Sequence, residues 1–516
     1  MKPYEHSARN AGKFPLGAGD TPYFRVSRRG GDVQIRGQAK AAFGHRIPVT
    51  SHRDDDGIFA GWDWDGERLV VSNDRYGFQP LFWTALADGG LAVSPSPLTL
   101  IDQGTRAELD IEALAVFFRL GYFIGEDTPF AAIRSVPPHA SFTWKGGQLE
   151  CVARYPGAPQ TFTGSRDEAI DEYIALFAQA MARRSPGDGA CAIPISGGRD
   201  SRHILLELHR TGFQPDVCVS GLDHPPDPNE DPKIAAILCR ELGFPLVVID
   251  QQLTQFAAQV RKNRETHFCA TAHGWYLALA DFLNGRFGST YDGIAGDVLS
   301  QSKFLKPDLD AVFHGEDSLA ICDALFARHA SSSRGIHALL NGPLKDCLDP
   351  GVARTRLARE ITRHLGRPNP VGSFIFWNRT RREIALAPCS LLRGIDRVYA
   401  PFVDHDLFDF LTTLPSSMLI DHCFHDDTIA RAYPHFAHIP YAHNAISGSD
   451  DRATRTRFAT DAARALVLAK PSRLTKNVTP RAKLLATVMS GGHVAPWVSP
   501  AIVYLHQLEL ILDAPR

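Results

Sequence analysis

The sequence lacks the features that would place it in a membrane, outside the cell or on a nucleic acid. No apolar run approaches the roughly 18 residues of a membrane-spanning helix, and the opening residues MKPYEH have no apolar signal core. Its 55 Lys and Arg residues nearly balance its 57 Asp and Glu residues, which does not support a general nucleic-acid partner or a polybasic membrane anchor. We therefore expect a cytoplasmic protein with no nucleic-acid and no membrane partner.

Cysteine is sparse and unclustered. The nine cysteines occur singly, without a Cys-x-x-Cys pair, and none precedes Cys151. Such a set is typical of reduced thiols and excludes a disulfide framework or a zinc site of standard spacing.

The length of 516 residues suggests two to four domains at roughly 150 residues each. Residues 1–20 are rich in Gly, Pro and charge and are predicted to form a flexible tail. Residues 21–160 read as a β-rich domain, with a hairpin over 57–72 around the turn Asp65-Gly66. A Pro- and Gly-rich linker at 155–159 precedes an amphipathic helix over 167–183, so the second domain is expected to span 161–516.

The second domain alternates strands with helices. Short apolar segments at 191–195, 217–220 and 246–249 are separated by helical patterns at 201–210 and 232–242. This alternation predicts a parallel sheet with helices on its faces, and therefore an α/β fold. Beyond about residue 300 the pattern is mostly helical.

The strongest chemical signal is ISGGRDS at residues 195–201, between a predicted strand and helix. Its two glycines allow close approach of a ligand to the backbone, and the following helix N-terminus is a ready anion site. The carboxylate of Asp200 beside such a site fits Mg²⁺ bound to a phosphate. The segment is not a Walker A loop, because the required spacing and lysine are missing. The alternative is a Ser-Gly turn that only caps the helix.

Four blocks in the same order resemble the asparagine synthetase superfamily. They are SGGRDS at 196–201, SNDRYGFQPL at 72–81, residues 120–138, and RVYAPFVDH at 397–405. The resemblance covers roughly residues 55–440. It implies an N-terminal αββα domain of the N-terminal-nucleophile hydrolase type, followed by an adenylating α/β domain with a helical C-terminal region.

The resemblance also implies a site for ATP and Mg²⁺. Asp200 and Asp297 would be the catalytic metal ligands, with a helix N-cap as the alternative role for Asp297. The strand at 217–220 would carry the adenine, and Asp231 would cap the next helix without a catalytic role. The residues expected to contact the nucleotide are Ser196, Gly197, Gly198, Asp200, Ser201 and Val219.

The N-terminal domain departs from the glutamine-hydrolysing members that it resembles. Those members need an N-terminal cysteine freed by removal of Met1, whereas residue 2 here is lysine and no cysteine occurs before Cys151. We therefore expect a degenerate amidotransferase-like domain without glutaminase activity, similar in this respect to β-lactam synthetase and the lasso-peptide cyclases.

The synthetase site also departs from the pattern of the family that it resembles. Ile294 stands where the family carries Glu or, in β-lactam synthetase, Tyr, and an alkyl side chain cannot move a proton. The family's late lysine is also missing, and His425, Arg431 and Lys476 are the candidates to replace it. A further oddity is Pro194, which removes an N–H from the strand before the loop.

Several other conspicuous residues are better explained by a structural role than by a catalytic or metal-binding one. The segment at 422–427 (HCFHDD) is expected to start a surface helix, since its spacing fits no standard metal site. Residues 54–56 (DDD) read as a solvated turn, and His203 as a surface or packing residue. Arg199 and Arg202 could contact phosphates or point to solvent.

These observations predict an ATP- and Mg²⁺-dependent ligase that forms an amide through an acyl-adenylate. Its partners would be a small-molecule or peptide carboxylate and an amine, with a partner biosynthetic protein as a further option. A macrocyclase or small-molecule ligase of the lasso-cyclase or β-lactam-synthetase type is favoured by the loss of the glutaminase nucleophile. The alternatives are an asparagine synthase that uses aspartate and ammonia, and a non-catalytic binding relative.

Overall fold

The computed structural model describes residues 21–29, 32–48, 55–155, 157–187, 189–224, 229–328, 349–442 and 498–512. The predicted tail at 1–20 and Lys476 lie outside these residues. Among the helices that are described, none has both the length and the apolar character required to cross a bilayer.

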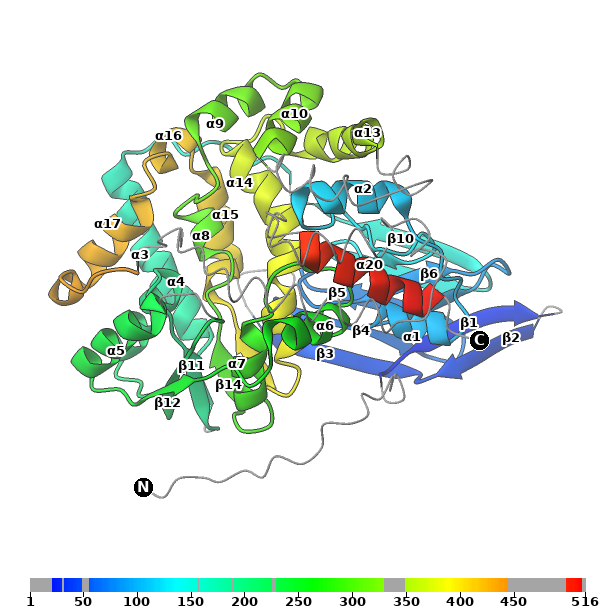
Figure 1. The fold of residues 1–516 in the computed structure, drawn as a ribbon, viewed down its shortest axis with the longest axis horizontal. Coiled ribbons are helices and arrows are strands. Elements are labelled where there is room, and N and C mark those ends of the chain that lie inside the picture. Colours follow the sequence, from blue (N-terminus) through cyan, green and yellow to red (C-terminus); the bar gives the residue numbers. More distant parts are fainter. Residues whose placement is uncertain are drawn as a thin grey trace, which may run out of the picture.

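The N-terminal part contains two five-stranded antiparallel sheets (Figure 1). The first has the order β2 (Asp32–Gly37), β1 (Phe24–Arg29), β7 (Leu91–Ser94), β6 (Phe82–Ala85), β8 (Arg134–Ser135). The second has the order β10 (Gln148–Ala153), β9 (Ala140–Lys145), β5 (Arg68–Asn73), β4 (Asp56–Trp64), β3 (Lys40–Ile47). The predicted hairpin is confirmed, because β4 pairs with β5 and Gly66 takes a φ of +105° in the turn.

A core of large apolar side chains fills the space between the two sheets, including Phe24, Val71, Phe142 and Trp144. Helices α1 (Pro97–Asp102) and α2 (Ile111–Leu120) share a second buried cluster with Phe82 and Ala92 of the first sheet. No further helix is described within residues 21–160. In the described residues, therefore, no helix of the N-terminal part covers the outer face of the second sheet. Of the expected αββα arrangement, the described residues therefore show both sheets and one helical layer, and the second sheet faces α15 (His405–Thr413) of the second part across a recess.

The second part begins with α3 (Arg166–Arg183), which starts in a capping box formed by Ser165 and Glu168. Its sheet is parallel, with the order β13 (Leu246–Ile249), β12 (Val217–Gly221), β11 (Cys191–Pro194), β14 (Ser289–Tyr291), β15 (Arg397–Tyr399). The predicted strands and crossover helices are therefore confirmed. One buried cluster joins this sheet to α3, α4 (Asp200–Arg210) and α5 (Glu230–Leu242), and another joins it to α7 (Tyr276–Leu283).

The strand order reverses between β11 and β14. From β11 the chain adds β12 and β13 on one side, and later adds β14 and β15 on the other. In an open α/β sheet, the carboxyl ends of the strands at such a reversal leave a crevice in which ligands bind. Pro194 is tolerated because the ladder between β11 and β14 ends at Ala192, whereas Ile195 N–H still donates to the Val219 carbonyl at 2.8 Å.

The rest of the described chain is mainly helical, as predicted for the region after residue 300. These helices surround the parallel sheet and the domain boundary (Figure 1): α6 (Gln255–Glu265), α8 (Gly296–Leu299), α9 (Pro307–His314), α10 (Ser318–Arg328), α13 (Pro350–Ile361), η1 (Thr362–His364), α14 (Pro370–Ile375), the π-helices η2 (Phe376–Ile384) and η3 (Ala387–Leu391), η4 (Pro401–Val403), α16 (Ser416–Leu419), α17 (Phe424–Ala432), η5 (Pro434–Phe436) and α20 (Val498–Leu512).

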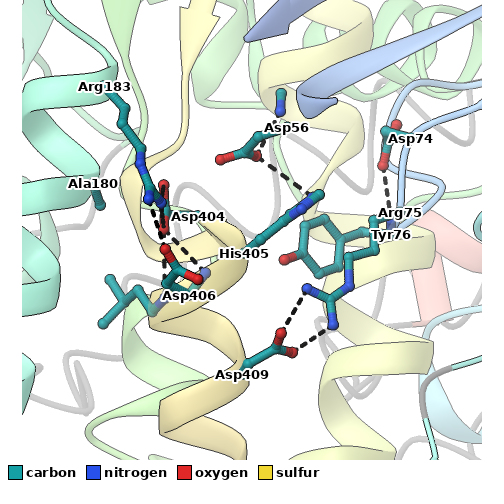
Figure 2. A network of polar contacts seen from close by, with 12 residues as sticks. Asp56, Asp74, Arg75, Tyr76, Ala180, Arg183, Asp404, His405, Asp406 and Asp409 are labelled. Carbon is teal, nitrogen blue, oxygen red and sulfur yellow. Dashed lines mark hydrogen bonds and ion pairs between the residues drawn. The ribbon is translucent and has the colours of Figure 1, made fainter. Parts of the chain in front are cut away.

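A buried ionic network joins the two parts. Arg184, at the end of α3, contacts Asp56 of β4 at 2.5 Å and Asp404, the N-cap of α15, at 2.6 Å. All three side chains are at most 1% exposed. Figure 2 shows the same region, with His405 directed toward Asp56 at 3.7 Å. The expectation of a solvated turn at 54–56 is therefore wrong for Asp56, while Asp54 lies outside the described residues.

Candidate functional site

The loops that follow β11 and β14 meet at the reversal of strand order and bring Asp200 and Asp297 together. Asp297 N–H donates to Asp200 Oδ2 at 3.0 Å. A methyl group on Gly293 or on Gly296 would lie 2.6 Å from side-chain atoms of Asp200. The two glycines therefore allow the β14 loop to close against Asp200.

The charge environment of Asp200 fits a bound cation. Burial and the nearby charge of Asp297 raise the pKa of Asp200 well above its usual range. Asp200 Oδ1 is buried, and within the described residues it has no hydrogen-bond partner. Two neighbouring carboxylates with an unused oxygen form the kind of hard oxygen donor set that Mg²⁺ prefers, so the predicted metal-ligating pair fits this geometry.

The SGG loop is held mainly by its own side chains. Ser201 Oγ accepts from Ser196 N–H at 3.1 Å, and Ser196 Oγ accepts from Gly198 N–H at 3.1 Å. Gly197 N–H donates to Asp231 Oδ1 at 2.8 Å. The Gly197 N–H is thus occupied by a carboxylate, and Asp231 lies in the first turn of α5 and anchors the loop, where only a capping role was expected.

Val219, a residue expected to contact the nucleotide, lies in β12. Its side chain is fully buried against Ala192 and α7, and its carbonyl accepts from Ile195 N–H. The side chain of Val219 is therefore part of the core, and its contact with a nucleotide stays a prediction. Positions at the carboxyl end of β12, such as Gly221, lie closer to the crevice edge.

Arg199 and Arg202 both point into the protein. Arg199 forms an ion pair with Asp426 of α17, and its guanidinium lies 4.5 Å from the ring centre of Tyr441. Arg202 is 2% exposed and donates to the Ile439 carbonyl at 2.7 Å. The two arginines therefore fix the C-terminal segment against α4, and neither points to solvent.

His425 lies behind Asp200. Its Nδ1 is 2.9 Å from Ser300 Oγ and 3.5 Å from Asp200 Oδ1, and its Nε2 is 3.1 Å from His203 Nδ1. Burial lowers the pKa of His425 to about 3, so the ring is neutral and cannot serve as the late cation. His203 is a packing residue, stacked on Phe177 with ring centres 3.7 Å apart.

The two other cation candidates are Arg431, on α17, and Lys476, which lies outside the described residues. Arg431 forms ion pairs with Asp167 and Asp171 of α3, so the prediction for Arg431 is wrong. Lys476 stays a prediction. The residue that sequence reasoning missed is Lys303, whose positive charge acts to lower the pKa of Asp200. Lys303 N–H also donates to the Asp297 carbonyl at 3.1 Å, and its place six residues after Asp297 could have revealed it.

Ile294 is 4% exposed and belongs to the apolar core, as its type predicts. The nearby carboxylate is Asp292, which immediately follows β14 and accepts from Ile294 N–H at 2.8 Å. Burial raises the pKa of Asp292 to about 6, and Tyr276 Oη lies 3.5 Å from its Oδ2. Asp292 can therefore exchange a proton near neutral pH. The position of Asp292, two residues before Ile294, was the feature of the sequence that could have identified it.

The segment at 422–427 starts a helix, as predicted, but it lies only partly at the surface, because Phe424 and His425 are fully buried. α17 starts at Phe424, Cys423 is exposed, and the described residues contain no group of three or more potential metal-ligating side chains.

Comparisons with known proteins point to one superfamily. A family model for a glutamine amidotransferase domain matches residues 49–155. Asparagine synthetase [glutamine-hydrolyzing] 3 of Bacillus subtilis (strain 168) is 28% identical over 151 residues, which are 29% of this chain and 25% of that protein. The aligned part thus spans about a quarter of that relative.

Solved structures show a weaker likeness. Glutamine phosphoribosylpyrophosphate amidotransferase from B. subtilis, complexed with ADP and GMP, is 12% identical, with 48% of this chain and 44% of that chain covered and a TM-score of 0.14. A structure described as the allosteric regulatory enzyme of purine biosynthesis is 11% identical, with 41% and 44% covered and a TM-score of 0.14.

Proposed function

Since this chain is a member of the asparagine synthetase superfamily, we propose that it is an ATP- and Mg²⁺-dependent, AMP-forming amide ligase. The observation that carries the proposal is the pair Asp200 and Asp297, brought together where the strand order reverses. Gly293 and Gly296 support it, because a side chain at either position would displace the Asp200 carboxylate.

In the first step, a carboxylate oxygen of the acid attacks the α-phosphorus of ATP. The bond between that phosphorus and the bridging oxygen breaks, and pyrophosphate leaves with an acyl-adenylate left behind. Asp200 and Asp297 would hold Mg²⁺, whose charge stabilises the departing pyrophosphate. Lys303 adds a positive charge on the same side, and the N-terminus of α4 favours anions.

In the second step, the amine nitrogen attacks the acyl carbon, and the bond from that carbon to the AMP oxygen breaks. The attacking nitrogen must lose a proton. Asp292 is the residue we assign to accept it, because its carboxylate has a pKa of about 6 and Ile294 cannot act. A general base typically contributes about 10²–10⁴-fold in rate.

Ile294, an alkyl side chain where the family carries Glu or Tyr, favours an acid larger or less charged than aspartate. This supports a macrocyclase or small-molecule ligase of the lasso-cyclase or β-lactam-synthetase type over an asparagine synthase. The carboxylate pair in turn argues against a non-catalytic binding relative.

Hydroxylamine trapping tests the proposal before the natural amine is known. The purified chain is incubated with ATP, Mg²⁺, hydroxylamine and a panel of amino acids, aryl acids and short peptides, and hydroxamate, AMP and ADP are measured. We expect AMP and hydroxamate in equal amounts with some acids, and their loss in Asp200→Asn. AMP formation that Asp200→Asn leaves unchanged, or ADP as the nucleotide product, would contradict the proposal.

A further inference from the structure

A second cavity lies at the boundary between the two parts of the chain, away from the loops after β11 and β14. It has a volume of about 660 Å³, within the range of pockets that hold small ligands. Its walls come from β3, β10 and α15, and its floor comes from the outer face of the second antiparallel sheet.

Strand register explains why the floor is open. Ser72 pairs with Ser141, and Ser141 pairs with Val152, so these three side chains lie in one row on the outer face. The row continues to Gly61, which pairs with Ser72 and has no side chain. Four small or medium residues in succession leave a depression. The neighbouring residues of the same strands, Val71 and Phe142, point into the core between the sheets.

The walls of this recess carry excess positive charge. Arg46, Arg75 and Arg154 face two aspartates, Asp55 and Asp409, which leaves one net positive charge before His139 and His405 are counted. Arg75 is neutralised by a two-contact ion pair with Asp409, visible in Figure 2. Arg154 forms no ion pair with any residue that the structure describes.

Arg46 is only loosely held. Its guanidinium contacts Asp55 at 3.3 Å, and both side chains are about half exposed, so the pair stabilises the fold by at most about 1 kcal/mol. The same guanidinium lies 3.6 Å from the ring centre of Phe59. The recess thus offers two cationic groups beside apolar surface from Phe59, Val152 and Tyr155.

We infer that this recess binds a small organic anion, whose carboxylate or phosphate pairs with Arg154 while its apolar part rests on Val152 and Tyr155. Guanidinium groups bind both kinds of anion with charge-assisted hydrogen bonds. The site is separate from the Asp200–Asp297 pair, so it does not depend on the proposed ligase activity.

Isothermal titration with two matched probes tests the inference. Hippurate represents the carboxylate and phenyl phosphate the phosphate, and the neutral amide of hippurate serves as the uncharged analogue. EDTA is present so that Asp200 and Asp297 hold no metal. We expect one or both anions to bind, and Arg154→Gln to weaken binding by about tenfold.

Arg106→Gln is the matched control, because Arg106 is an exposed arginine that lies outside the recess and is paired with Glu108. It should leave binding unchanged. The inference is overturned if neither anion binds, if the neutral amide binds equally well, or if Arg106→Gln and Arg154→Gln weaken binding to the same extent.

Discussion

Replacement of Gly296 by alanine is a sharp test of how the site is built. The added Cβ would lie 2.6 Å from Asp200 Cγ and 2.6 Å from Asp200 Oδ1. Ordinary contacts begin near 3.5 Å, so Asp200 and the β14 loop must separate by about 0.9 Å. Gly296 does not have a positive φ, so the alanine backbone itself is not strained.

The displacement acts on a proposed metal ligand. Changes next to such ligands typically cost about 10–100-fold in metal affinity or activity. We therefore expect Gly296→Ala to weaken the Mg²⁺-dependent binding of α,β-methylene-ATP by about 10–100-fold, measured by isothermal titration. Circular dichroism should show an unchanged fold.

Gly189→Ala is the control for this experiment. Gly189 also has no positive φ, and a Cβ there would meet no atom of the described residues within 4 Å. Its nucleotide affinity should equal that of the unmodified chain. Equal affinity in Gly296→Ala and Gly189→Ala would refute the reasoning that the glycine contact positions Asp200.

Three further predictions follow from other parts of the structure. Glutamine should not be hydrolysed, because the first cysteine in the sequence is Cys151 and partial burial of its thiol raises the pKa of that thiol; enzyme-dependent glutamate release would contradict this. Aspartate and ammonium should give asparagine far below about 1 s⁻¹, and Ile294→Glu should raise the rate; rapid turnover by the unmodified chain would show that Ile294 was misread. Burial lowers the pKa of Lys262 to about 7 from 10.5, so between these pH values the unfolded chain binds a proton that the folded chain does not. The stability of the unmodified chain relative to Lys262→Met should therefore rise by up to about 1.4 kcal/mol per pH unit from pH 7 to 10, and a difference in Tm between the two proteins that is independent of pH would contradict the assignment.

Local patterns in the sequence were sufficient to predict most of the second domain. The strand at 246–249 matches β13, and α5 ends at Gly243, which takes a φ of +72°. Such elements are determined by apolar runs and by stop signals within a few residues.

Partners distant in the sequence were not predictable in the same way. Asp56 is buried because Arg184 reaches it from 128 residues away, and nothing near residues 54–56 signals that contact. The burial of the Val219 side chain was not predictable in detail, because a strand covered on both faces is apolar throughout and its sequence does not show which side chains face the loops.

The carboxylate pair was predictable because both aspartates follow apolar strands within glycine-rich segments. The absence of a usable cation at His425 was not predictable, since its burial depends on α3, α4 and α8 packing around it. Lys303 and Asp292 lay near predicted site residues, and their spacing from Asp297 and Ile294 was the signal that the sequence offered.

The most direct test of the central claim is metal binding by the carboxylate pair. Mn²⁺ replaces Mg²⁺, and the electron paramagnetic resonance signal of free Mn²⁺ is followed as protein is added in the presence of α,β-methylene-ATP. The unmodified chain should remove Mn²⁺ from solution beyond what the nucleotide alone binds, and Asp200→Asn and Asp297→Asn should each abolish that effect. Uptake of Mn²⁺ by both variants at the level of the unmodified chain, or no uptake by the unmodified chain, would contradict the account.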